Sequence, residues 1–261
     1  MISVDYFKSR LIGSPLVTPL LALKDYVDSI RGRKNPDLAL AEAEEAAIPL
    51  VLRKLLTKSS NCIDVGCHLG SVLHEFTVIA PQGRHMAFEP TPRKAGWLKR
   101  KFPKVEVHGM ALGETAGEVS FFLNQTRSGF SSLVPNGEPN VDLIEEIKVP
   151  CERLDTMVGD DRKIDFIKID VEGFELPVIR GATKVFARDR PYLMFESMNF
   201  HFQKFGYTPI EMYNYVNKEL GYSIFLFTDF LQGGEPLDVA RYEAAHHYPF
   251  RAYNFLAAPK T

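Results

Sequence analysis

From residue 61 onward, short apolar runs alternate with longer stretches in which apolar residues recur at helical spacing. The short runs are typical of buried strands, and the second pattern is typical of amphipathic helices. Alternation of the two predicts parallel strands joined by crossover helices, and hence a doubly wound α/β sheet. The pattern places strands at residues 62–65, 84–88, 105–108, 164–169 and 192–195, and helices at 71–79, 93–102 and 174–186.

Two parts of the chain depart from this alternation. Residues 117–133 and 147–151 have the pattern of antiparallel strands, inserted between the third and fourth parallel strands. After a helix predicted near 209–220, residues 223–227 and 253–257 have the pattern of a closing pair of strands. We therefore predict a main sheet of about seven strands with a small β insertion.

The N-terminal region differs in character from the rest. Amphipathic helices are predicted near residues 20–30 and 36–56, so we expect a helical cap over 1–58 ahead of an α/β domain over 59–261. The apolar stretch 11–23 is too short to span a bilayer and contains two prolines. We interpret it as the apolar face of the cap on a soluble protein, with no membrane span and no clear signal-peptide cleavage site.

The charged residues nearly cancel, with 31 basic against 33 acidic side chains. No strong field therefore points to nucleic acid or to an anionic membrane as a partner. The basic run 93–104 is interpreted as a solvated helix face with Trp97 turned inward. The three cysteines form no CxxC pair, which argues for a reducing, cytoplasmic compartment and against a disulfide framework or a zinc site.

The turn after the first strand lies in the stretch NCIDVGCHLGSVLHEF, where an open α/β sheet binds its ligand. A dinucleotide site has glycine in the middle of this turn, because bare backbone approaches a pyrophosphate. His68 occupies that position between Gly66 and Gly70, and its ring would crowd the pyrophosphate. Asp64 would repel phosphate and favour an ammonium or a sulfonium group. S-adenosylmethionine carries both cations and has no phosphate, so we predict it as the cofactor.

Glu89 ends the second strand in the motif AFEP, 19 residues beyond Gly70. A carboxylate at this place can accept hydrogen bonds from both ribose hydroxyls. Enzymes that use NAD have the same feature, so Glu89 alone does not distinguish the two cofactors. As single residues, Asp64 could equally be a helix N-cap and Glu89 an exposed strand-end carboxylate. Their joint spacing favours nucleotide binding.

A second group of acids follows the fourth and fifth strands. In IDFIKIDVEGFE, the strand period of two puts Lys168 and Asp170 on one face. They could form a buried ion pair, with Glu172 at the start of the next helix, or one of these acids could accept a substrate hydroxyl as general base. Glu196 ends the fifth strand at the same rim, and His201 lies nearby as a reserve base. Acids that converge on one mouth favour a functional role.

A resemblance to a known family covers residues 61–196 and rests on motifs in chain order. They are IDVGCHLG, AFEP, ALGETAGEVSFF, the SS of GFSSL, ERLDTM, IDFIKIDVEGFE and the strand that ends in Glu196. Together they resemble the FkbM family of S-adenosylmethionine-dependent methyltransferases, whose last strand the tail YNFLAAPK also fits. The resemblance implies a Rossmann-like class I methyltransferase fold with an antiparallel last strand. It also implies methyl transfer, usually to hydroxyl oxygens of sugars, glycans and polyketide-like natural products.

The resemblance assigns roles position by position. Glu89 would bind the ribose, Met110 and Ala111 would flank the adenine, and Asp170 would face the transferred methyl group. The residues that would surround the methionine part of the cofactor are Asp64, Gly66, Cys67, His68 and Gly70. The residues that would surround Asp170 are Lys168, Glu172 and Glu196.

An enzyme of this kind must align its reactants and exclude water, and an alcohol also needs a base within about 3 Å of its oxygen. A metal could activate a diol instead, but the sequence has no dedicated ligand cluster beyond these acids, so we expect metal-free chemistry. We predict an O-methyltransferase that acts on a hydroxyl of a sugar, glycan or glycosylated or polyketide-like metabolite. The alternatives are transfer to nitrogen or carbon, a non-catalytic cofactor-binding protein, and a nicotinamide-dependent oxidoreductase, against which Asp64 and His68 argue.

Overall fold

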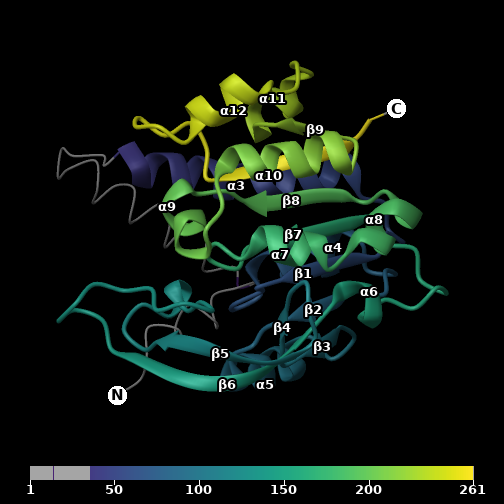
Figure 1. Cartoon of the computed structure of the whole chain (residues 1–261). Helices are drawn as coiled ribbons and strands as arrows, with labels where there is room; N and C mark the ends of the chain where they lie inside the picture. Colours follow the sequence, from purple (N-terminus) through teal and green to yellow (C-terminus); the bar gives the residue numbers. More distant parts are fainter. Residues whose placement is uncertain (1–13, 15–35, 261) are drawn as a thin grey trace.

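Seven strands form one sheet in the order β3-β2-β1-β7-β8-β10-β9, in a computed structural model that describes residue 14 and residues 36–260 (Figure 1). The pairings from β3 through to β8 are parallel, whereas β10 runs antiparallel to both of its neighbours. This is the predicted Rossmann-like class I arrangement. The strands are β1 (Cys62–Val65), β2 (Met86–Phe88), β3 (Glu106–His108), β7 (Phe166–Ile169), β8 (Tyr192–Glu196), β9 (Tyr222–Phe225) and β10 (Asn254–Pro259).

The order of the strands reverses next to β1. The chain steps outward from β1 to β2 and β3 and then returns to place β7 and β8 on the other side of β1. Helices α4 (Ser71–Ile79) and α5 (Pro92–Lys101) connect the strands on the first side. Ligands of such sheets bind at the carboxyl ends of the strands that flank the reversal. The carboxyl ends of β1 and β7 are therefore where a site is expected.

The side chains of the sheet divide between two buried layers, because they alternate along each strand. On one face, Ile63 of β1 and Ile167 of β7 pack with helices that follow β7. On the other face, Cys62 of β1 and Phe166 of β7 pack with α3 (Pro36–Leu55) and α4. Cover on both faces explains why these strands are read in the sequence as nearly continuous apolar runs.

The single helix expected over residues 174–186 is instead two helices, α7 (Glu175–Arg180) and α8 (Thr183–Asp189). Between them, Gly181 packs so closely that an added Cβ would lie 2.0 Å from the carbonyl oxygen of Gly113. The break therefore depends on a contact between residues far apart in the chain. A contact of this kind does not alter the spacing of apolar residues within the segment, so the sequence pattern did not predict the break.

The C-terminal part follows the prediction with shifted boundaries. The helix expected over 209–220 is α10 (Pro209–Asn214), which opens with a capping box between Thr208 and Glu211 and continues as a π-helix (Tyr215–Glu219). Helices shorter than two turns have too few positions to show a period. Those that the pattern did not reveal are α6 (Leu154–Met157), α9 (Asn199–Phe202), α11 (Phe227–Gln232) and α12 (Val239–Ala245).

The predicted β insertion is a three-stranded sheet in the order β4-β6-β5, which lies below the main sheet in Figure 1. Its strands are β4 (Ala111–Leu112), β5 (Gly117–Asn124) and β6 (Ile144–Glu152). β5 ends earlier than expected because the side-chain oxygen of Asn124 accepts the backbone N–H groups of Thr126 and Arg127, at 3.1 and 2.7 Å. Residues 125–143, which we call the insertion loop, then join β5 to β6.

Helix α3, drawn in purple in Figure 1, packs as part of the main core. Its Val51 and Leu52 are fully buried in the layer that contains α4 and Phe227 of α11. Glu44 ties the helix to the start of β10, since its carboxylate accepts the backbone N–H groups of Tyr253 and Asn254 at 2.9 and 3.2 Å.

Other expectations for the N-terminal region concern residues that the structure does not describe. The helix expected at 20–30 and, apart from residue 14, the apolar stretch 11–23 lie outside the described residues, and the division of the chain at residue 58 stays a prediction. Among the residues described, no helix combines the length and the apolar character needed to cross a bilayer.

The packing of α3 predicts unequal effects of two leucine substitutions on the same helix. Leu52 is 0% exposed, so Leu52→Ala should lower the free energy of unfolding by about 2–5 kcal/mol. Leu50 is 56% exposed, so Leu50→Ala serves as a matched control with a change below about 1 kcal/mol. Urea denaturation of both variants makes the comparison. Equal, small effects would mean that α3 does not belong to the core.

Candidate functional site

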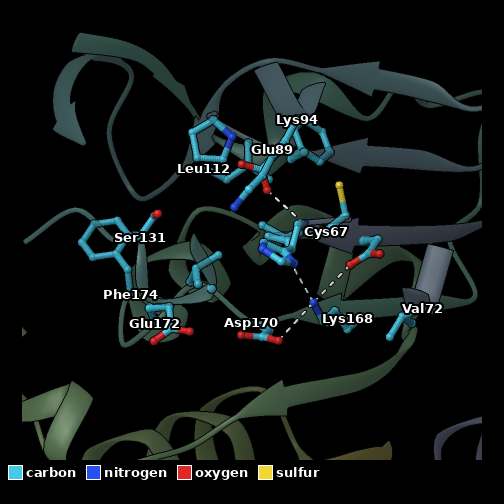
Figure 2. Close-up of a pocket in the computed structure, with 18 of the residues that line it drawn as sticks. Cys67, Val72, Glu89, Lys94, Leu112, Ser131, Lys168, Asp170, Glu172 and Phe174 are labelled. Atoms are coloured by element: carbon cyan, nitrogen blue, oxygen red, sulfur yellow. Dashed lines mark hydrogen bonds and ion pairs between the residues drawn. The ribbon is translucent and has the colours of Figure 1, made fainter. Parts of the chain in front are cut away.

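A cavity of about 310 Å³ lies at the carboxyl ends of β1, β2 and β7, next to the reversal of strand order (Figure 2). Its walls come from the turn after β1, the acids that end β2 and β7, the β insertion and α3. The site residues predicted from the sequence that line it are Asp64, Gly66, Cys67, His68, Glu89, Met110, Ala111, Lys168, Asp170 and Glu172.

The turn after β1 is held by close packing and by a buried carboxylate. Gly66 has a φ of 72°, and an added Cβ would lie 1.8 Å from the carbonyl oxygen of Asp170, so glycine is required. Glu89 accepts the backbone N–H of His68 and that of Thr91, each at 2.9 Å. Glu89 is only 4% exposed, so the alternative of an exposed strand-end carboxylate is wrong.

Gly70 has a structural role rather than a place in the cavity wall. It caps α4 with a φ of 76°, and an added Cβ would lie 2.7 Å from the ring of Phe102 after α5. Because Gly70 is the N-cap of α4, the alternative of an N-cap role for Asp64 is also wrong.

A buried lysine joins the two central strands at their carboxyl ends. The Nζ atom of Lys168 lies 3.3 Å from a carboxylate oxygen of Asp64 and 3.3 Å from one of Asp170; a dashed line in Figure 2 marks the contact with Asp170. It also donates a hydrogen bond to the carbonyl oxygen of Gly66 at 3.1 Å. The ion pair considered for Lys168 and Asp170 is therefore present. Asp170 keeps 38% of its side chain exposed and can still meet a ligand.

Burial and charge act in opposite directions on this group. Burial raises the pKa of Asp64, and the Lys168 ammonium partly offsets that effect. Burial lowers the pKa of Lys168, but Asp170 and Asp64 outweigh burial and leave it raised. Lys168 is therefore charged at neutral pH. Burial also raises the pKa of the Cys67 thiol well above its ordinary value, so Cys67 contributes shape rather than a nucleophile.

The insertion loop is fastened over the cavity by two side chains. The Nε2 atom of His68 lies 2.9 Å from Ser128 Oγ, and Lys94 Nζ donates to the carbonyl oxygen of Ser128 at 2.9 Å. Lys94 is 7% exposed, so the interpretation of residues 93–104 as a solvated face is wrong at this residue. His68 thus replaces the middle glycine with a group that holds a cover on the site.

Several residues of the cavity wall were not singled out from the sequence. They come from α3, α5, the β insertion, the N-cap of α7 and β10, and their nearness to the turn after β1 depends on the fold. A buried lysine within a basic helix gives no local signal. These residues are Glu45, Ile48, Lys94, Leu112, Phe121, Ser128, Phe174 and Asn254.

Three further predicted residues, Glu172, His201 and Glu196, form what we call the Glu-His-Glu cluster. His201 of α9 lies between the two acids, with Nδ1 at 3.3 Å from Glu196 and Nε2 at 3.4 Å from Glu172. Glu172 also lines the cavity, so the cluster meets the cavity through this side chain. Burial, followed by the charges of Glu196 and Asp170, raises the pKa of Glu172. Burial raises the pKa of Glu196 and lowers that of His201.

Glu175 supports the turn that presents Glu172. It is 0% exposed, and its carboxylate accepts the backbone N–H of Val171 at 2.9 Å and that of Gly173 at 3.2 Å. Burial and the nearby charge of Glu196 raise the pKa of Glu175 to about 8.

The raised pKa of Glu175 predicts a loss of stability as the pH rises. The folded protein holds a proton that the unfolded chain releases above pH 4.5, so this contribution is complete below pH 4.5 and is lost as the pH passes through about 8. Glu175→Gln should remove that loss. Between pH 4.5 and about 8, the difference in unfolding free energy between the variant and the wild type should therefore shift in favour of the variant by up to about 1.4 kcal/mol per pH unit. Chemical denaturation across this range measures the difference. Glu118→Gln, on the exposed side of β5, is the control, and parallel curves for Glu175→Gln and the wild type would contradict the account.

Comparisons with known proteins agree with this geometry. A family model described as the methyltransferase FkbM domain matches residues 64–224, from the end of β1 to β9. Methyltransferase 1 of Beauveria bassiana (strain ARSEF 2860) is 25% identical over 141 residues, which cover 46% of this chain and 57% of that protein. The crystal structure of a methyltransferase FkbM from Methylobacillus flagellatus KT has a TM-score of 0.50 at 20% identity, over 78% of this chain and 44% of that one. The chain therefore spans about half the length of these relatives.

The matched segment covers more than half of the chain and contains the turn after β1, the Lys168 ion pairs and the Glu-His-Glu cluster. The protein belongs to the FkbM methyltransferase family.

Proposed function

We propose that the protein is an S-adenosylmethionine-dependent O-methyltransferase. Its acceptor is a hydroxyl group of a sugar, a glycan, or a glycosylated or polyketide-like metabolite. The observation that carries the proposal is the acidic turn at the strand-order reversal. There the buried Asp64 and Glu89 flank a glycine turn whose middle position is His68. That surface disfavours a pyrophosphate and suits a nucleoside with an ammonium group.

The residues of the cavity fit this cofactor part by part. Glu89 uses one lone pair of each oxygen for the backbone N–H groups of His68 and Thr91, and the others remain for ribose hydroxyls. Met110 and Ala111 supply apolar surface for the adenine, together with Leu112 and Phe121. The close packing of Gly66 on Asp170 leaves backbone and a carboxylate for the amino-acid part. When bound, S-adenosylmethionine supplies a methyl group on a positively charged sulfur.

The protein's own contribution is to align the acceptor, exclude water and accept a proton. The insertion loop covers one side through Ser128, and α3 covers another through Glu45 and Ile48. An alcohol that gains a methyl group loses its O–H proton, so a carboxylate near the acceptor oxygen assists. Asp170 suits this role, because its carboxylate is partly exposed beside the cavity and lies 3.3 Å from the ammonium group of Lys168.

Transfer of a labelled methyl group to a panel of hydroxyl, amine and carbon acceptors tests the proposal. Product from the sugar and polyketide-like alcohols supports it, and product from amines alone would contradict transfer to oxygen.

In that assay Asp170→Asn should lower turnover by about 10²–10⁴-fold with little change in cofactor affinity. The melting temperature should change little, because Lys168 keeps Asp64 as a partner. Asp160→Asn, on an exposed side chain, is the control, and a folded Asp170→Asn variant with normal turnover would remove Asp170 from this role.

A further inference from the structure

The Glu-His-Glu cluster contains more acceptor atoms than donors. One carboxylate oxygen from each glutamate and a ring nitrogen of His201 lie within 4.8 Å of one another. They come from three separate places, namely the turn after β7, the end of β8, and α9. The side chains of Glu172 and Glu196 are each 15% exposed and that of His201 is 4% exposed, so bulk water satisfies little of this demand.

The imidazole of His201 faces a carboxylate at both nitrogens. A neutral imidazole has one N–H and one lone pair, so it can donate to Glu172 or to Glu196 but not to both. The neutral imidazole is also the form in which histidine binds a metal ion. One buried ring nitrogen therefore points its lone pair at a carboxylate oxygen 3.3 or 3.4 Å away. That arrangement is repulsive unless a cation or an additional proton lies between the two atoms.

The surrounding cations offset the charge of the cluster only in part. Among residues 36–260, Lys168 is shared between Asp64 and Asp170, and Lys204 Nζ donates to the side-chain oxygen of Asn136 at 2.6 Å. Asn136 in turn donates to Glu172 at 3.3 Å. The Lys204 ammonium still acts on Glu172 and the Lys168 ammonium on Glu196, but three acids outside the cluster, Asp170, Glu175 and Glu44, act in the opposite direction. The net charge in and around the cluster is therefore negative.

The backbone holds these side chains together. Glu172 has a φ of 59°, in the left-handed region that is uncommon for a residue other than glycine. The next residue, Gly173, has a φ of 106°, and an added Cβ would lie 2.8 Å from the carbonyl oxygen of His201. Glycine at this position lets the first turn of α9 approach the turn after β7. The buried Glu175 fixes that turn through its two backbone hydrogen bonds.

We propose that Glu172, Glu196 and His201 bind a divalent metal cation. Bonds of about 2.0–2.2 Å to nitrogen and oxygen put ligand atoms of one ion up to about 4.4 Å apart, close to the observed spread. Carboxylates favour hard ions and imidazole favours transition-metal ions, so two carboxylates with one imidazole suit a first-row transition-metal ion such as Mn²⁺. The ion would supply the positive charge that the imidazole and the two acids lack, and it would bring the carboxylates together without protonation. This proposal departs from the metal-free chemistry expected from the sequence.

The site would act on the acceptor, and this consequence rests on the proposed function. Glu172 lines the cavity, so an ion held by the cluster would lie next to the space for the acceptor. The cation would hold an acceptor hydroxyl in place and would lower its pKa by stabilising the alkoxide. The oxygen keeps the O–H electron pair, and the proton passes to the Asp170 carboxylate. No redox change is involved. A vicinal diol, which offers two oxygens to one ion, is the acceptor class that such a site favours.

Titration with Mn²⁺ tests the site without any methyl transfer. The full-length protein is freed of metal with a chelator and titrated by calorimetry, and the loss of the free-ion signal is followed by electron paramagnetic resonance. One ion should bind per chain. Glu196→Gln and His201→Ala should each weaken Mn²⁺ binding by at least about tenfold. Loss of a residue that only supports a metal ligand already costs about that much, and these two residues would be ligands themselves. Glu118→Gln, at an exposed residue of β5 outside the cluster, is the control that should bind Mn²⁺ with wild-type affinity.

Two results would overturn the metal site. One is the absence of saturable Mn²⁺ binding by the wild-type protein, a measurement that needs no variant to fold. It would leave the cluster as a carboxylate–imidazole–carboxylate group that shares protons. The other is wild-type affinity in folded Glu196→Gln and His201→Ala variants. Mn²⁺ binding without methyl transfer would count against the proposed function alone, and methyl transfer without Mn²⁺ binding would count against the metal site alone.

Discussion

The rest of the site depends on the two ion pairs that the ammonium group of Lys168 forms with Asp64 and Asp170. The register of β1 and β7 sets Asp64 directly beside Lys168, and Asp170 follows two residues later on the same face. Without the lysine, the buried carboxylate of Asp64 would face the partly exposed carboxylate of Asp170 and the carbonyl oxygen of Gly66, and an unpaired buried charge costs several kcal/mol. With it, the turn after β1 and the strand that precedes Asp170 are fixed relative to each other.

This pair of contacts divides the site into two halves. On one side are the turn after β1, Glu89 and the apolar wall of the β insertion, which suit a nucleoside with no phosphate. On the other are Glu172, His201 and Glu196, a dense acidic group that suits a cation and an acceptor oxygen. Asp170 belongs to both halves, since it pairs with Lys168 and adds to the negative charge that raises the pKa of Glu172.

The sequence predicted what depends on local pattern. Alternation of strand and helix gave the doubly wound sheet, and the strand period of two put Lys168 and Asp170 on one face, where the structure has their ion pair. The acids at the ends of β1 and β2 were placed at the cavity for the same reason, because strand ends in such a sheet share one edge.

What the sequence missed depends on contacts between distant segments. Lys94 appeared as one more charge on a basic helix, and its burial under Ser128 depends on the insertion loop 34 residues later. The break between α7 and α8 depends on Gly113, and the meeting of His201 with two glutamates depends on how Gly173 admits α9. Sequence spacing alone could place these acids at one rim, but it could not show that an imidazole lies between them.

The most direct test of the central claim is calorimetric titration of the protein with S-adenosylhomocysteine and, separately, with NAD. The account predicts that S-adenosylhomocysteine binds and that NAD at the same concentration does not. It also predicts that Glu89→Ala, while folded, weakens S-adenosylhomocysteine binding by about 1.5–3 kcal/mol, or about one to two decades, through the loss of hydrogen bonds to a charged acceptor. Binding of NAD with no binding of S-adenosylhomocysteine would contradict the account.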